Sequence, residues 1–305
     1  MRGSTFRSNY EFNRMYPVRK GAVMKKTSKG WYALYTFPLM FAFIIVVVVP
    51  FVIGIGLSFV EWDGLAKHAM TFVGFDNYLE VFKDVRFLNS AGRTTIYTLV
   101  SVLFVNLFGL VFALLVTTKL KAANVARTLL FVPYLIGGLI LGFIWKGVFS
   151  ELFISLNWGN WLTDPTKAMI ALVVVTTWQM AGYVMIVYIT GIMAIPDEVV
   201  EAANVDGASY LQTLFKVKFP LLMPSFTICL FLTLSNCFKV YDVNIALTGA
   251  GPNYQSEMFS LNIYNEIFDL SNFGYGQAKA IIFFIIIAII TMIQVSVTKK
   301  REVEM

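Results

Sequence analysis

A charged segment set between two long apolar stretches holds the residues of this chain whose types and spacing best suit contact with another molecule. Residues 196–224 read PDEVVEAANVDGASYLQTLFKVKFPLLMP. Glu201 and Asp206 offer carboxylates for charge-assisted hydrogen bonds to basic groups. The small residues beside them, which would let another surface approach closely, are Ala202, Ala203, Gly207 and Ala208. The pattern predicts a docking surface, and an ordinary loop is the alternative by composition alone.

The same segment is predicted to fold as two short helices joined by a turn. Pro196 and Asp197 suit a helix start, and the acidic side chains early in this helix suit its dipole. Gly207 permits the positive φ with which helices commonly end. A second helix would then run from Ala208 to Lys216.

The chain lacks the residue clusters that enzymes use. It has no GxxxxGK[ST] loop for nucleotide phosphates, and a single histidine, His68, leaves no metal cluster and no Ser-His-Asp triad. Its two cysteines, Cys229 and Cys237, are predicted to pack as small buried residues without a disulfide. We therefore predict that the chain is not an enzyme and holds no metal and no cofactor of its own.

Composition points to a membrane protein. The 305 residues are 58% hydrophobic and 14% charged, whereas a soluble domain carries roughly 25% charged residues. A helix needs about 20 apolar residues to cross a bilayer. Six stretches qualify, and none shows the short alternating pattern of barrel strands: 33–60, 94–118, 128–145, 168–195, 219–238 and 280–298. We predict an all-α membrane protein with six transmembrane helices.

Orientation follows from the basic residues in the loops. Six spans place both termini on one side, where 16 Lys and Arg residues fall, against five on the other. Both termini and the 196–224 segment are therefore predicted to be cytoplasmic, and the net charge of +6 is a topology signal rather than a sign of nucleic-acid binding. Near the outer end of the fifth stretch, Lys239 and Asp242 have the spacing to pair on one helix face.

The chain divides into three predicted parts. Residues 1–29 form a basic cytoplasmic tail, residues 30–298 the six-helix domain with its cytoplasmic segment 196–224, and residues 299–305 a cytoplasmic C-terminal tail. Residues 1–4 read MRGS, which resembles an expression leader, and Met24 would make a plausible natural start. Residues 1–23 are therefore left out of the reasoning about the fold.

The sequence EAANVDGASYLQTLFKVKFP resembles the EAA signature of binding-protein-dependent ABC importer permeases. That signature is EAA, three residues, G, nine residues, I, one residue and LP. Val217 stands for Ile and Phe219 for Leu in this signature. The other signature positions match outright, and they are Glu201, Ala202, Ala203, Gly207 and Pro220. The TGAGP at 248–252 and the FVGFDNY at 72–78 are similar to the carbohydrate-uptake branch of this family, in which the first of these is usually TGGGP.

This resemblance implies a type I ABC importer permease in a bacterial cytoplasmic membrane. Such permeases work with a second permease subunit as a heterodimer, a dimer of ATPase subunits that binds ATP and Mg²⁺, and an extracytoplasmic solute-binding protein. The EAA elbow would be the coupling helix on the ATPase. The residues that this assigns to coupling are Glu201, Ala202, Ala203, Asp206, Gly207, Ala208 and Pro220. The implied function is ATP-driven sugar or oligosaccharide uptake by alternating access.

A sugar pathway would need polar groups and flat aromatic faces along a cavity. In similar sugar permeases the fourth and fifth helices line the substrate site, and Tyr183 falls where an aromatic is found. The candidate lining residues are Trp178, Gln179, Tyr183, Thr233, Asn236, Cys237 and Val240. Cys237 and Val240 fall at positions that are polar in maltose-type permeases, which suggests a different substrate. Hydrogen bonding between helices is the alternative role for the polar members of this set.

Two other functions stay open at this point. A permease for glycerol-3-phosphate or a related polyol phosphate would favour basic groups in the pathway, and the candidate lining contains none. A membrane scaffold that binds partners without transport would need neither a polar pathway nor ATP hydrolysis.

Overall fold

The computed structural model describes residues 29–65, 67–118, 122–300 and 302, and it divides into two compact units, 1–53 and 54–305. Most of the predicted N-terminal tail and much of the C-terminal tail lie outside the described residues, as do Lys119 and Lys121 of a predicted cytoplasmic loop.

The first unit holds most of the first apolar span. Helix α2 (Lys29–Phe43) continues through a short π-helical turn, η1 (Ile44–Val48), into α3 (Val49–Leu57), which runs on into the second unit. Residues Leu34–Leu57 are long and apolar enough to cross a membrane, and none of their most apolar window is buried. The prediction of a span at 33–60 agrees with this helix to within a few residues.

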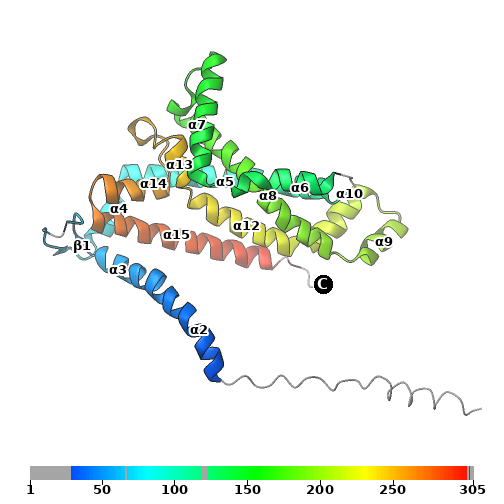
Figure 1. Cartoon of the computed structure of the whole chain (residues 1–305), viewed down its shortest axis with the longest axis horizontal. Coiled ribbons are helices and arrows are strands. Elements are labelled where there is room, and N and C mark those ends of the chain that lie inside the picture. The colour runs from blue at the N-terminus through cyan, green and yellow to red at the C-terminus, as the bar shows by residue number, and fades with distance from the viewer. Residues whose placement is uncertain (1–28, 66, 119–121, 301, 303–305) are drawn as a thin grey trace, which may run out of the picture. The chain divides into compact units, whose positions relative to one another are not determined.

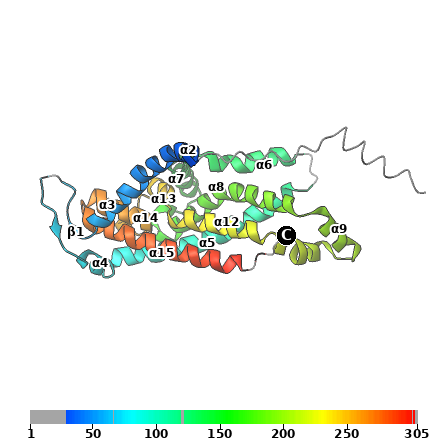
Figure 2. The same cartoon turned by 90° about the horizontal axis from the view of Figure 1, so that it is seen from below.

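Four long helices form the core of the second unit and lie side by side (Figures 1 and 2). They are α5 (Val85–Val116), α8 (Pro165–Ala194), α12 (Met223–Phe238) and α15 (Phe273–Lys299). Buried Tyr97, Leu172 and Met185 belong to the apolar cluster that joins the first three of these helices. A smaller cluster around Phe87 and Phe259 packs against α15.

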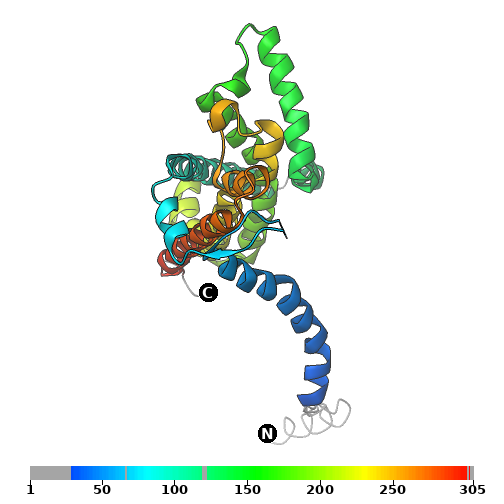
Figure 3. The ribbon, with the colours of Figure 1, turned by 90° about the vertical axis from the view of Figure 1, so that its left-hand side faces the viewer.

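The third predicted span, 128–145, is not one helix. The chain forms α6 (Ala123–Phe131), a 3₁₀ turn η2 (Val132–Leu135) and then α7 (Gly138–Ser155). Pro133 has no backbone N–H to continue a helix, and Ile136 and Gly137 are extended. The membrane-crossing candidate is therefore α7, which reaches away from the bundle in Figure 3.

The fifth predicted span is bent. Residues Tyr210–Leu221 and Met223–Phe238 pass the test for a membrane span together, but their axes differ by 68°. Among the described residues, five helices could each cross a membrane, and the bent pair makes a sixth. The predicted all-α class with six spans is confirmed at this level, with one small addition: strands β1 (Val60–Glu61) and β2 (Thr71–Phe72) pair antiparallel.

The loops gather at the two ends of the bundle (Figure 1). One end carries the EAA segment together with the C-terminal end of α15. Its elements are α9 (Asp197–Val205), α10 (Tyr210–Gln212), the π-helical turn η4 (Thr213–Lys218) and α11 (Phe219–Leu221). The opposite end carries the two strands, α4 (Asp76–Val81), α14 (Phe259–Tyr264) and the π-helical turn η6 (Asn265–Asp269). Short 3₁₀ turns lie at η3 (Trp161–Thr163) and η5 (Pro252–Tyr254).

Candidate functional site

A polar pocket of about 300 Å³ lies where α8, α12, α7 and the short helix α13 (Asp242–Leu247) meet. Hydrogen-bonding side chains from separate elements converge on it. They include Tyr97, Tyr134, Gln179, Asn236, Lys239 and Asp242. An apolar segment of a membrane protein has no need for such groups unless they pair with one another or meet something polar. The pocket is therefore the best candidate for a solute site in this chain.

One wall of the pocket is the helix break that directly follows the fifth span. Helix α12 ends at Phe238 and α13 begins at Asp242, and between them Tyr241 has the non-helical angles φ −133° and ψ −61°. The spacing of Lys239 and Asp242 would allow them to pair on one helix face. Helix α12 instead ends before Lys239 and α13 begins at Asp242, and each residue lines the pocket separately.

A second break forms the facing wall. The extended link between η2 and α7 exposes the Ile136 carbonyl, which accepts a hydrogen bond of 2.9 Å from the Gln179 side chain on α8. Beside it, the Tyr134 ring stacks on the Tyr183 ring at 4.4 Å between centroids and 11° between planes. Tyr134 lines the pocket, and Tyr183 lies behind it against the core.

Two glycines of α7 hold α13 in place. A Cβ added to Gly142 would lie 2.6 Å from Cβ of Ala246, and one added to Gly138 would lie 2.9 Å from Cβ of Asp242. Only glycine permits this approach, because real Cβ atoms essentially never come so close to another heavy atom. The GxxxG pattern of residues 138–142 thus fixes the distance between α7 and the pocket wall.

Two of the predicted lining residues on α12 do not reach the pocket. Thr233 and Cys237 are buried within the bundle, at 0% and 1% exposure. Thr233 Oγ1 accepts a 3.0 Å hydrogen bond from Asn106, whose Oδ1 accepts one of 3.0 Å from Tyr188. This network joins α5, α8 and α12, which is the interhelical role that was weighed against the pathway role. Gln179, Asn236 and Val240 do line the pocket.

Trp178 faces a different cavity. It lines a larger groove, about 660 Å³, between α5, α6 and α8 whose surface is almost wholly hydrocarbon. Its ring meets Trp145 edge to face at 5.5 Å between centroids. A groove without hydrogen-bonding groups does not suit a hydrophilic solute, so the smaller polar pocket remains the better candidate.

The pocket contains charge that the sequence reasoning did not assign to it. None of the lining residues predicted from the sequence is basic, whereas Lys239 lines this pocket together with Asp242. Tyr134 and Tyr241 were missed as well. Pro133 and Gly137 in an apolar stretch were the available signal for a helix break near Tyr134.

The EAA segment folds as its sequence predicts at the first helix and the turn. Helix α9 begins after Pro196 and ends at Val205, and Gly207 has φ +78°. A Cβ on Gly207 would meet nothing within 4 Å, so glycine is required here for its backbone conformation rather than for space. Ser209 then caps α10 through a capping box with Gln212, and the second helix includes a π-helical turn.

The surface around this turn is apolar and uncovered. Val205 is 87% exposed, and Tyr210, Leu211 and Phe215 follow it with more than half of their surface open. Glu201 and Asp206 are exposed beside them and take part in none of the ion pairs found among the described residues. Exposed apolar side chains together with free carboxylates are typical of a surface that another protein covers.

Comparison with known proteins shows which family the chain belongs to. Residues 105–303 match the family described as binding-protein-dependent transport system inner membrane component. The "Probable starch degradation products transport system permease protein AmyD" of Thermoanaerobacterium thermosulfurigenes is 44% identical over 282 residues, covering 90% of this chain and 96% of that protein. The "Multiple sugar-binding transport system permease protein MsmF" of Streptococcus mutans is 34% identical, covering 83% and 90%.

A solved structure has the same fold. The crystal structure of a bacterial ABC transporter involved in the import of the acidic polysaccharide alginate contains a chain with a TM-score of 0.74 and 21% identity. The match covers 88% of this chain and 96% of that one. The protein described here therefore belongs to the binding-protein-dependent transport system inner membrane component family. It is an integral membrane transport protein and not an enzyme, as the sequence predicts.

The glycine contact between α7 and α13 can be tested directly. Gly142→Val should lower the stability of the purified protein by about 1–3 kcal/mol, the usual result of overpacking, because its side chain would overlap Ala246. Thermal unfolding in detergent measures this. Gly147→Val on the same helix is the matched control, since a Cβ there meets nothing within 4 Å. Equal melting temperatures for the two variants would contradict the contact.

Proposed function

We propose that this chain is the permease subunit of an ABC importer that carries a sugar or oligosaccharide across the bacterial cytoplasmic membrane. The observation that carries the proposal is the polar pocket enclosed by two helix breaks in a member of a transport family. Non-helical backbone at membrane depth is tolerated where it lines a cavity, and such breaks mark substrate sites in other transporters.

The chemistry of the pocket suits a carbohydrate. Gln179 and Asn236 offer amide groups, and Lys239 and Asp242 offer a cationic donor and an anionic acceptor for hydroxyl groups. Tyr134 supplies a flat ring, which is held in position by the ring of Tyr183 behind it. The names of AmyD and MsmF, which refer to starch degradation products and multiple sugars, point the same way.

Coupling to ATP hydrolysis would occur through the EAA segment. The carboxylates of Glu201 and Asp206 would pair with basic groups of a separate ATPase subunit, while the small residues at Ala202, Ala203 and Ala208 let the two surfaces approach. Pro220, where the second half of the segment turns into the bundle, would carry the movement onward. ATPase closure would then switch the pocket between inward and outward access as a rigid-body movement.

The assembly proposed for this chain contains four kinds of protein. They are this permease, a second permease subunit, a dimer of ATPase subunits that binds ATP and Mg²⁺, and an extracytoplasmic solute-binding protein. The family description names the binding protein as the defining partner of such systems. In this arrangement both termini and the 196–224 segment are cytoplasmic, in keeping with the distribution of basic residues.

A polyol-phosphate substrate is the second candidate, and Lys239 is the observation that favours it. A phosphate needs a cation, and Lys239 is a basic residue that lines the pocket. Asp242 lines the same pocket, however, and its carboxylate would repel an anion. A neutral sugar satisfies both side chains, so it remains the preferred substrate. A scaffold without transport would leave the polar pocket without a role.

Uptake by cells with and without this chain tests the substrate class. Deleting the gene should abolish uptake of labelled glucose oligosaccharides of the kind that starch yields, and leave uptake of glycerol-3-phosphate unchanged. Restoring the gene should restore sugar uptake. Loss of glycerol-3-phosphate uptake alone would favour the second candidate, and no loss for either solute would contradict a transport role in this substrate range.

Lys239→Gln separates the two substrates at the pocket itself. A glutamine still donates a hydrogen bond to a hydroxyl, so sugar uptake should fall by less than about tenfold, since one neutral hydrogen bond contributes about 1 kcal/mol. A phosphate would lose its counter-charge and a larger part of its binding. Initial uptake rates measure the difference, and Lys146→Gln on α7 serves as a control outside the pocket. Loss of sugar uptake well beyond tenfold would contradict the neutral-sugar assignment.

Gly207→Asp should abolish binding of the ATPase subunit to the EAA segment. A β-carbon at φ +78° strains the turn, and the added carboxylate changes the docking surface. Asn204→Asp adds the same charge nearby, within α9, without that strain and is the matched control. Purification in mild detergent should recover the ATPase with wild type and Asn204→Asp but not with Gly207→Asp. Retention of the ATPase by Gly207→Asp, with transport-coupled hydrolysis intact, would sink the coupling proposal.

A further inference from the structure

The segment between α13 and α14 has an unusual backbone. Five of its residues have φ between 50° and 69°: Gly249, Ala250, Gly251, Asn253 and Tyr254. The two glycines adopt this region readily, but the three residues with side chains are disfavoured there. Such conformations persist only where the surrounding structure holds them in place. We therefore expect contacts with the rest of the fold to hold residues 248–256.

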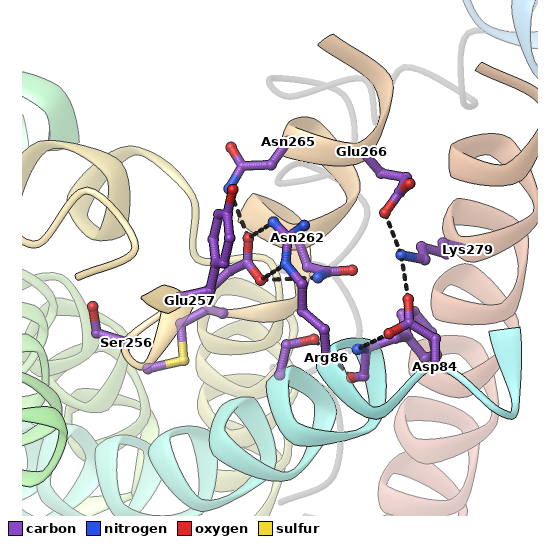
Figure 4. Close-up of polar contacts among 12 residues, drawn as sticks. Asp84, Arg86, Ser256, Glu257, Asn262, Asn265, Glu266 and Lys279 are labelled. Atoms are coloured by element: carbon purple, nitrogen blue, oxygen red, sulfur yellow. Dashed lines mark hydrogen bonds and ion pairs between the residues drawn. The ribbon is translucent and has the colours of Figure 1, made fainter. Parts of the chain in front are cut away.

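One anchor is an ion pair whose carboxylate is buried and whose arginine is partly exposed. The Arg86 guanidinium on α5 donates to both oxygens of Glu257, at 2.8 Å and 2.5 Å, and its plane covers the Tyr254 ring at 3.6 Å from the centroid. Figure 4 shows the Glu257 carboxylate enclosed by its partners. Asn262 and Asn265 each donate a further hydrogen bond to it, and Glu257 is completely buried.

A second arginine of α5 donates hydrogen bonds to backbone carbonyl groups of the same segment. Arg93 Nε donates to the carbonyl of Glu257 and its Nη2 donates to that of Tyr254, both at 3.1 Å. The end of the strained segment is thus tied to α5 through the Glu257 side chain and through two carbonyl groups.

The anchored residues are also bonded to the pocket wall. Asn244 of α13 is fully buried, and its Nδ2 donates to the Ser256 carbonyl at 2.9 Å. Its Oδ1 accepts from the Met258 amide at 3.0 Å. These two residues flank Glu257 in the chain, and Val243, directly before Asn244, lines the polar pocket. A continuous path therefore runs from Arg86 through Glu257 and Asn244 to the pocket.

We propose that Arg86 and Glu257 are positioning residues, and that their ion pair, with its buried carboxylate, holds α13 and so fixes one wall of the polar pocket. The proposal rests on the proposed function, in which that pocket is the path of the sugar. A buried ion pair contributes little net stability compared with apolar residues of equal volume, but it can specify a single arrangement. That property suits the wall of a binding site.

A neighbouring cluster provides a matched comparison. Lys279 of α15 binds Asp84 at 2.7 Å and Glu266 at 2.6 Å, and Glu266 is nearly as buried as Glu257. Burial by itself would raise the pKa of Asp84, but hydrogen bonds from Lys279 and from the Phe87 amide lower it. Figure 4 shows this second cluster beside the first. Its hydrogen bonds join α5, η6 and α15, and none of them reaches α13.

Thiol labelling of the assembled transporter in nanodiscs tests the proposal. Val243→Cys places a reporter on α13 at a site that is 6% exposed, and native Cys229 on α12, at 0%, reports general loosening. Glu257→Gln should speed the labelling of the Val243→Cys reporter about tenfold, equivalent to about 1.4 kcal/mol, while Cys229 stays slow. Arg86→Lys, which keeps the charge and loses the fork, should act in the same direction and carries the test if Glu257→Gln does not assemble.

Glu266→Gln is the control for loss of a buried carboxylate. It should leave the labelling rate of the reporter within about twofold, because its cluster does not touch α13. Three results would overturn the positioning role. Glu266→Gln could speed the labelling as much as Glu257→Gln does, or Cys229 could become labelled in parallel with the reporter. The third is that neither Glu257→Gln nor Arg86→Lys speeds the labelling. Sugar uptake by the same proteins is measured separately. If wild type carries no sugar, the transport proposal fails, whereas the labelling pattern still decides whether the ion pair holds α13.

Discussion

Backbone amide and carbonyl groups cannot stay unpaired in the hydrocarbon of a membrane, and the form of this protein follows from that constraint. Its apolar stretches are helical almost throughout because a helix satisfies these groups internally. The two interruptions next to candidate spans, around Ile136 before α7 and around Tyr241 after α12, border the same polar pocket. At the first of them, the Gln179 side chain supplies the hydrogen bond that the backbone lacks. The helix breaks form the pocket, and the polar groups of the pocket in turn satisfy backbone groups that the breaks leave unpaired.

The same constraint separates the polar residues of α12 into two roles. Thr233 and Cys237 turn inward, where Thr233 joins the Asn106 and Tyr188 network that ties three helices together. Asn236 lies between them in sequence but faces the pocket. A spacing of three or four residues groups positions on one face only approximately, since a helix has about 3.6 residues in each turn. Cys237 is buried among the helices, whereas the amide of Asn236, one position before it, faces the pocket.

Much of the fold could be predicted from the sequence, because hydropathy reports directly on which segments enter a membrane. The EAA turn could be predicted too, since Gly207 and the flanking charges are local signals. The breaks were harder to find, because Pro133 lies in a stretch that is apolar on both sides. Hydropathy alone cannot tell a kinked helix from two separate ones there. The spacing of Lys239 and Asp242 also favoured one shared helix face, but this required the helix to continue past Phe238, where α12 ends.

The buried ion pairs lay beyond sequence reasoning for a different reason. Arg86 and Arg93 are two of the five basic residues assigned to the outer side, and Lys279 directly precedes the predicted sixth span, 280–298. Their burial depends on Glu257 and Glu266, which lie up to 171 residues away along the chain. No local pattern reports such a contact. A charge in a loop is usually solvated. The packing of α14 and η6 against α5 and α15 buries Lys279 and the two glutamates and leaves the two arginines partly exposed.

The two ends of the bundle therefore differ in how far their interactions are completed within the chain. At the end that carries α14, the buried carboxylates of Glu257 and Glu266 have their partners within the chain. At the end that carries α9, Val205 and Phe215 are uncovered and Glu201 has no ion-pair partner among the described residues. Helix α8 leads directly into α9, and α12 follows α11 at the other side of the same segment. Both helices also line the polar pocket. The pocket therefore lies along the two helices that connect the uncovered end of the bundle to the end where the charges are paired.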